Sequence, residues 1–394
     1  MAWGMEPEIG EHACRLAEVA VRVGLNLQPG QRLIIAEPFL LQGVARSAAP
    51  LVAAVERVAR DAGASRVETI WGDVLEWRRA ASGWPDRSFR EQWEANTQRL
   101  VRAVTEGAAL LFLQGAHPEL GAGLPVKPVA KMRAFCGELY GRVAPDLLAG
   151  ATNWAAVPAP VPEWAEAVYP DLPHAERLVA LWRAVGAACR TGAVDPVATW
   201  HEHVAGLERR RDELNTRRVR TVRLLGPGTD LTMALPPGHR WCAASLVTKG
   251  GLRFVPNLPT EEVFTAPERR SAEGRLRVAR TVCYGGALLE GVELEFHGGS
   301  VVRATAKRGA DVLERLLDAD RGASRLGEVA LVPAGTAVAR MGRCFLHPLL
   351  DENALPHVAL GDAYGFTADE SAAGALNRSR VHVDLPIDAE VVLG

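Results

Sequence analysis

The hydrophobic pattern changes near residues 214–222, and this change constrains the fold more than any other feature. Before it, long helical patterns alternate with short apolar runs; after it, short alternating runs are broken by Gly and Pro. Strands separated by helices predict a parallel α/β sheet, whereas short runs joined by turns predict antiparallel pairs. We therefore predict two domains, residues 1–216 and 217–394, each long enough for its own core.

Residues 1–216 are predicted to form an α/β domain with a parallel sheet. Strands are expected at 32–36 and 66–71, with a helix over 43–62 between them and another central strand at 108–113. No G-x-G-x-x-G motif follows the first strand, so the pattern does not favour a dinucleotide site.

Residues 217–394 are predicted to form an α+β domain that is mostly antiparallel. Strands are expected at 219–225 and 229–235, on either side of a Gly-Pro-Gly turn. Residues 292–296 alternate between apolar and acidic side chains, and a Gly-Gly turn leads from them into 301–304, which predicts a hairpin.

Charge and composition argue against several classes of protein. The 45 basic and 47 acidic residues nearly balance, so no basic field for nucleic acid is expected. We also expect no membrane partner, because no apolar run reaches the roughly 18 residues of a spanning helix and no signal peptide is evident. The six cysteines are scattered without a C-x-x-C pair, which favours reduced thiols in a cytoplasmic protein. No G-x-S-x-G motif occurs, which argues against a serine hydrolase.

Side chains that can bind metal ions recur in the C-terminal half. His382 and Asp384 lie two residues apart in an alternating run, so both are expected on one face of a strand. Glu328 and Glu262 each precede apolar residues, and a carboxylate that faces a core is costly unless it is paired or bound to metal. A lone His-x-Asp pair is nevertheless more often structural than metal-binding, so the spacing leaves both roles open.

His357 lies in a segment that is typical of a helix start. Asp351 and Asn353 can cap a helix, and Pro356 is tolerated only in its first turn. Tyr364 follows seven residues after His357 and suits either a metal site or simple packing. On a preceding helix, His201 and His203 are expected at the surface, because rings two residues apart on a helix point in different directions.

Six segments together resemble the M29 family of metallo-aminopeptidases, in the same order and over nearly the whole chain. They are GTDLTMALPPGHRW (228–241), RFVPNLPTEEVFTAP (253–267), YGGALLEGVELEF (284–296), LGEVALVP (326–333), DENALPHVALGDAY (351–364) and NRSRVHVD (377–384). The resemblance implies a two-metal exopeptidase that removes amino-terminal residues. It also implies that residues 1–216 form a scaffold that limits substrate access, that residues 217–394 are catalytic, and that the protein is a homodimer.

The resemblance also implies which residues act. By position, the metal ligands of the family fall on Glu262, Glu328, His357, Tyr364, His382 and Asp384. They are expected to hold two divalent ions, for which Zn, Co, Mn and Mg are candidates. Tyr364 is expected either to bind metal or to donate to the tetrahedral oxyanion, and Glu261 to transfer a proton or hold the substrate amine. The expected substrate is a peptide or an aminoacyl amide.

Two departures from the family pattern leave alternatives open. Pro348 and Pro356 stand where less constrained residues are expected, and the tail after Asp384 is short. A specialised amide hydrolase on the same scaffold is one alternative. A mononuclear Fe(II) ring-cleaving dioxygenase, which would use only the two histidines and Asp384, is another; the retention of Glu262 and Glu328 argues against it.

Overall fold

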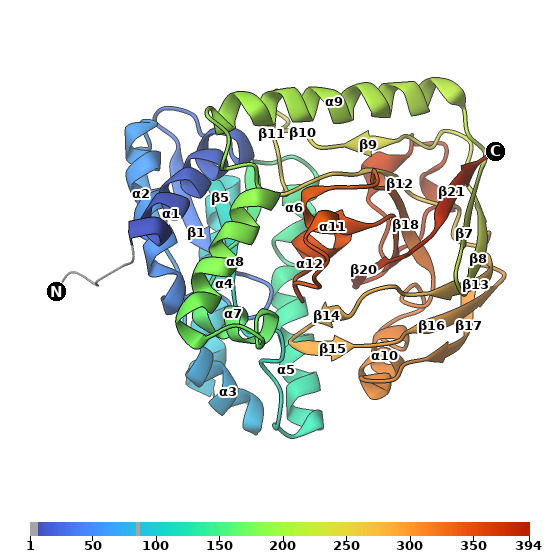
Figure 1. Cartoon of the computed structure of the whole chain (residues 1–394), viewed down its shortest axis with the longest axis horizontal. Coiled ribbons are helices and arrows are strands. Elements are labelled where there is room, and N and C mark those ends of the chain that lie inside the picture. Colours follow the sequence, from blue (N-terminus) through green and yellow to red (C-terminus); the bar gives the residue numbers. More distant parts are fainter. Residues whose placement is uncertain (1–6, 84–86) are drawn as a thin grey trace. The chain divides into compact units, whose positions relative to one another are not determined.

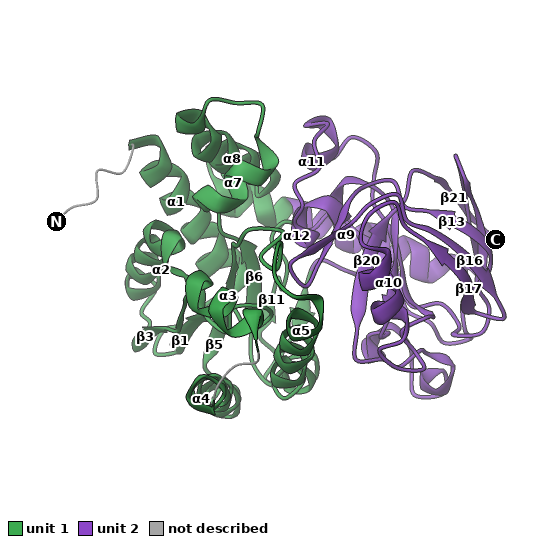
Figure 2. Cartoon of the chain, turned by 90° about the horizontal axis from the view of Figure 1, so that it is seen from below, with its two compact units in different colours: residues 1–202, 245–259 green, residues 203–244, 260–394 purple. Residues whose placement is uncertain are grey.

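The computed structural model describes residues 7–83 and 87–394 (Figure 1). The chain forms two compact units, which Figure 2 colours green and purple. The first contains the described residues up to 202 together with 245–259, and the second contains 203–244 and 260–394. Helix α9 (Pro196–Arg217) runs from the first unit into the second and contains the predicted boundary between residues 216 and 217.

The first unit is built on a parallel sheet, which confirms the predicted α/β class. Its strand order is β3-β1-β5-β6, and every pairing is parallel. The strands are β1 (Arg32–Ala36), β3 (Arg66–Thr69), β5 (Ala109–Gln114) and β6 (Trp154–Pro158), with short pairs β2 (Val44–Ala45) and β4 (Trp71–Gly72), and β10 (Leu246–Val247) and β11 (Arg253–Phe254). Strands β1, β5 and β6 are almost entirely buried because helices pack around them (Figure 1), whereas the edge strand β3 is partly exposed.

The helices of the first unit depart locally from the predicted ranges. They are α1 (Pro7–Val19), α2 (Ala49–Asp61), α3 (Val74–Ser82), α4 (Arg87–Thr105), α5 (Val126–Tyr140), α6 (Ala144–Leu148), α7 (Pro162–Val168) and α8 (His174–Ala188). The helix predicted over 43–62 begins only at Ala49, because Pro50 is accommodated in a first turn and not in a helix interior.

The second unit contains two antiparallel sheets, as predicted for the C-terminal half. One has the order β20-β19-β18-β12-β9 and the other β17-β16-β13-β8-β7-β21. The first comprises β9 (Cys242–Ala243), β12 (Val263–Thr265), β18 (Leu326–Leu331), β19 (His357–Gly361) and β20 (His382–Pro386). The second comprises β7 (Thr221–Gly226), β8 (Thr229–Ala234), β13 (Glu273–Arg277), β16 (Glu293–His297), β17 (Ser300–Thr305) and β21 (Glu390–Leu393).

Short elements complete the second unit. They are the hairpin β14 (Val282–Tyr284) and β15 (Ala287–Leu289) and the helices α10 (Ala310–Leu317), α11 (Ala337–Arg340) and α12 (Pro348–Asp351), with a 3-10 turn at Glu352–Ala354. All six cysteines are free thiols. No helix in the described part of the chain combines the length and apolar character needed to cross a bilayer.

The helix start predicted around His357 is wrong. The helical turn forms earlier, at Pro348–Asp351, and the chain is already extended at Leu355. A residue before proline is disfavoured in the helical region, so Pro356 ends the turn. His357 then begins β19, which pairs with β18 on one side and β20 on the other.

Candidate metal centre

The candidate ligands gather on one face of the five-stranded sheet. Glu328 lies opposite Ala359, and Ala359 lies opposite Asp384 on the next strand. In the same way Ala330, two residues after Glu328, lies opposite His357. Side chains opposite each other share a face, so these carboxylates and the imidazole project to the same side. Small alanine side chains between them leave room for other atoms.

A β-bulge at Gly327 turns Glu328 toward this face. Leu326 pairs with Leu360, but Glu328 pairs with Ala359, so the alternation of β18 shifts by one residue at Gly327. A Cβ atom on residue 327 would lie 2.2 Å from the carbonyl oxygen of Asp362. Only glycine therefore allows the bulge, and the bulge places Leu326 in the core and Glu328 in the site.

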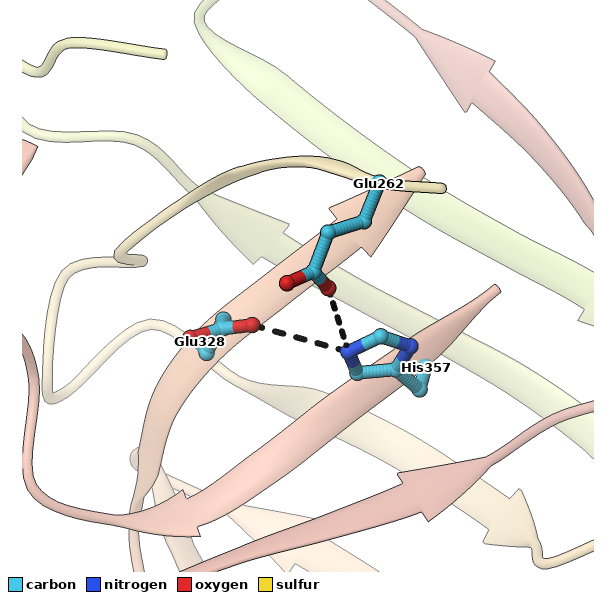
Figure 3. A group of neighbouring side chains, drawn as sticks. All are labelled: Glu262, Glu328 and His357. Atoms are coloured by element: carbon cyan, nitrogen blue, oxygen red, sulfur yellow. Dashed lines mark ion pairs between the residues drawn. The ribbon is translucent and has the colours of Figure 1, made fainter. Parts of the chain in front are cut away.

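Two groups of donor atoms converge, and Glu328 belongs to both. In the first, His357 Nε2 lies 3.0 Å from Glu262 Oε2 and 3.5 Å from Glu328 Oε1 (Figure 3). In the second, His382 Nε2 lies 3.6 Å from Glu328 Oε2 and 3.4 Å from Asp384 Oδ1. The two oxygens of a single carboxylate thus face two different imidazoles.

Backbone carbonyls hold both imidazole rings by the nitrogen that faces away from the carboxylates. His382 Nδ1 lies 2.8 Å from the carbonyl oxygen of Asp362, and His357 Nδ1 lies 3.4 Å from that of Leu355. An N–H at Nδ1 donates to each carbonyl, which leaves the Nε2 lone pair directed at the carboxylates. Metal-binding histidines are commonly oriented in this way.

The buried charges of the site are suited to a cation. Glu262 Oε2 is buried and accepts no hydrogen bond within the described residues, even though an imidazole nitrogen is near. Burial, together with the charges of Glu262 and Asp384, raises the pKa of Glu328 to about 7. Carboxylate oxygens and imidazole nitrogens are ligands that Zn, Co and Mn accept. The donor set therefore fits divalent metal.

The same carboxylates also shift the pKa values of the two histidines. Although burial opposes it, the charges of Asp384 and Glu328 raise the pKa of His382 to about 10. His382 in turn lowers the pKa of Asp384 to about 2, again against burial. The carboxylates of Glu262 and Glu328 likewise raise the pKa of His357 well above its usual range, more than burial lowers it. Positive charge is thus favoured between each Nε2 and the carboxylates, and a metal ion at that position would replace the proton.

Glu352 is a further carboxylate of this cluster, which sequence reasoning missed. Its side chain is buried and hydrogen-bonds to Asp384. Burial and the charges of Asp384 and Glu262 raise the pKa of Glu352 well above its usual range. No local signal marked this residue, because its direct neighbours Asp351 and Asn353 are polar and the segment resembles an exposed turn.

The two predicted catalytic residues occupy different surroundings. The ring of Tyr364 lies against His382, with centroids 4.8 Å apart, and stacks on Phe366 at 5.4 Å. Glu261 is buried, and its Oε2 lies 3.6 Å from His203 Nε2. The expectation that His203 is a surface residue is wrong, because its ring is mostly buried and Nε2 lies 2.7 Å from the carbonyl oxygen of Thr260.

Comparisons with known proteins agree on one family. The family model described as thermophilic metalloprotease (M29) matches residues 11–392. Aminopeptidase T of Thermus thermophilus is 39% identical over 382 residues, which cover 95% of this chain and 92% of the relative. Aminopeptidase 2 of Geobacillus stearothermophilus is 34% identical over 381 residues, covering 95% and 91%. The solved structure of wild-type AmpT from Thermus thermophilus superposes with a TM-score of 0.87 at 37% identity and covers 97% of each chain.

Proposed function

The chain belongs to the M29 family of metalloproteases, and we propose that it is an aminopeptidase that uses two divalent metal ions held on one face of its five-stranded sheet. One observation supports the two-ion site most directly. The two oxygens of Glu328 lie 3.5 Å and 3.6 Å from Nε2 of two different histidines. A carboxylate placed in this way can bridge a pair of ions.

Each ion has its own set of proposed ligands. Glu262, Glu328 and His357 would hold the first ion, and Glu328, His382 and Asp384 the second. We include Glu352 as a further carboxylate beside Asp384, and we retain Tyr364 as a ligand or oxyanion donor because its ring lies against His382. Zn, Co, Mn and Mg all remain candidates for the ions, with nitrogen ligands favouring the first three.

When bound, such a pair of ions supplies a hydroxide near neutral pH and polarises the scissile carbonyl. The residues of the chain orient the reaction around it. Carbonyl oxygens of Leu355 and Asp362 fix the imidazole rings, and the hydroxyl of Tyr364 would donate to the developing oxyanion. Glu261, with His203 beside it, would transfer a proton or hold the substrate amine.

Buried negative charge would favour substrates with a free α-ammonium group. The carboxylates of Glu262, Glu328, Glu352 and Asp384 outnumber the two imidazoles of the proposed site, and Glu261 is a further buried carboxylate next to Glu262 in the sequence. We therefore propose peptides or aminoacyl amides with a free amino terminus as substrates.

The family resemblance also implies roles for the two halves of the chain. Residues 217–394 would be catalytic, and residues 1–216 would limit the access of substrate. The protein would be a homodimer, and light scattering that shows only monomer would contradict this last point.

The proposal is tested with chelator-stripped protein that is reloaded with Zn, Co, Mn or Mg. We expect hydrolysis of short peptides with a free amino terminus, no hydrolysis of the same peptides after N-acetylation, and two ions bound per chain. Cleavage of amides but not peptides would instead identify a specialised amide hydrolase. One ferrous ion per chain together with oxygen uptake would replace the proposal with the dioxygenase alternative.

A further inference from the structure

A buried amide side chain joins two segments that carry proposed metal ligands. Asn353 is fully buried. Its Oδ1 accepts a hydrogen bond of 2.6 Å from the backbone N–H of Glu261, the residue before Glu262. Its Nδ2 donates to Glu352 Oε1 at 3.3 Å and to the carbonyl oxygen of Leu349 at 2.9 Å. The amide therefore links the loop of Glu262 to the segment that leads to His357, two segments that are 92 residues apart in the sequence.

The chemistry at this position requires an amide. A peptide N–H on one side needs an acceptor, while a carboxylate and a carbonyl on the other side need a donor. Asparagine offers both within one short side chain, whereas aspartate lacks the donor and an aliphatic residue lacks both. Since every group it meets is buried, each lost hydrogen bond would leave an unsatisfied partner.

Asn353 is itself anchored. Thr336 Oγ1 donates a 2.8 Å hydrogen bond to the backbone carbonyl of Asn353 and accepts one of 3.1 Å from the N–H of Ala339 at the start of α11. The amide is thus fixed from its backbone as well as from its side chain. Fixed groups that contact metal-binding residues set both the geometry and the affinity of a site.

We propose that Asn353 is a positioning residue that sets the distance between Glu262 and the Glu352–His357 segment and thereby determines the affinity of the first ion. This inference rests on the proposed two-ion function. The second group depends chiefly on other supports, because Glu328 and Asp384 lie on β18 and β20, which both pair with β19, and His382 is held by the carbonyl of Asp362. Asn353 reaches this group only indirectly, through Glu352, which hydrogen-bonds to Asp384. Loss of the amide should therefore lower the affinity of the site for the first ion much more than for the second ion.

The experiment is a calorimetric titration of Zn²⁺ alone into chelator-stripped wild-type protein and Asn353→Ser. We expect the variant to weaken one of the two binding steps by about 10- to 100-fold and to leave the other within about threefold. Thr336→Val is a milder second variant that keeps the test open if Asn353→Ser fails to fold, and it should weaken the same step by about 3- to 10-fold.

The matched control is Asn153→Ser in the first unit. Asn153 is equally buried, accepts a 2.6 Å hydrogen bond from Gln31 Nε2 and donates one of 2.7 Å to the carbonyl oxygen of Leu25. It should lower the unfolding temperature and leave both Zn²⁺ steps unchanged. Equal weakening of both steps by Asn353→Ser, no weakening, or the same weakening by Asn153→Ser would overturn this inference alone. Wild-type protein that binds no divalent ion would overturn the proposed function together with it.

Discussion

Replacing Glu328 with glutamine should have opposite effects on stability with and without metal. In the metal-free protein, burial raises the pKa of Glu328 from its usual 4.5 to about 7. The folded state then holds the proton more tightly than the unfolded state, so the stabilisation is complete below about pH 4.5 and is lost as the pH rises through 7. At about 1.4 kcal/mol for each pKa unit, the loss reaches about 3 kcal/mol at pH 8.

Glutamine cannot ionise and escapes this loss. Metal-free Glu328→Gln should therefore be more stable than the metal-free wild type at about pH 8, by up to about 3 kcal/mol, and similar to it near pH 4.5. Added metal reverses the order, because each of the two ions at a hundredfold excess over its Kd stabilises the wild type by about 2.7 kcal/mol. The two together contribute about 5 kcal/mol, whereas the variant has lost the ligand that they share. Hydrolysis should fall by at least about a thousandfold, which corresponds to roughly 4 kcal/mol of barrier.

The assay is urea unfolding followed by circular dichroism near pH 5 and pH 8, with chelator and then with Zn²⁺, together with kcat/KM on a dipeptide. Glu293→Gln, on an exposed position of β16, is the control and should change none of these quantities. The reasoning fails if metal-free Glu328→Gln is less stable than wild type at pH 8. Full turnover by the variant would refute the assignment of Glu328 as the shared ligand.

Three other predictions test separate features. Gly327→Ala should destabilise the protein by at least about 2 kcal/mol, because the new Cβ would lie 2.2 Å from the carbonyl oxygen of Asp362; an unchanged melting temperature would contradict the bulge. Arg280→Met should cost about 3–5 kcal/mol by leaving Asp351, now 3.2 Å from Arg280 Nη1, buried without its partner. Burial already raises the pKa of Asp351, so that cost should be larger at pH 8 than at pH 5, and adding Asp351→Asn should relieve it. Removal of metal by chelator should abolish hydrolysis and lower the unfolding temperature, with both restored by added ions; activity that survives verified metal removal would contradict metal dependence.

Local backbone geometry explains what could be predicted from the sequence. The alternation around His382 and Asp384 correctly indicated a strand with both side chains on one face. Glu328 stands at the head of an apolar run that does form a buried strand, and Glu262 directly precedes β12. Each of these patterns depends on residues within a few positions of one another, so the sequence displays them directly.

Contacts between distant segments decided the rest. Helical and extended conformations were both locally available to His357, and pairing of β19 with β18 and β20 selected the strand. Whether a carboxylate such as Glu352 is buried depends on what packs over it, and no local pattern records that. The link from Asn353 to the backbone of Glu261 is likewise invisible until the chain has folded. The sequence by itself determined which side chains could bind metal, and only the tertiary structure decided which of them meet, because spacing along the chain fixes the direction of a side chain but not its neighbours.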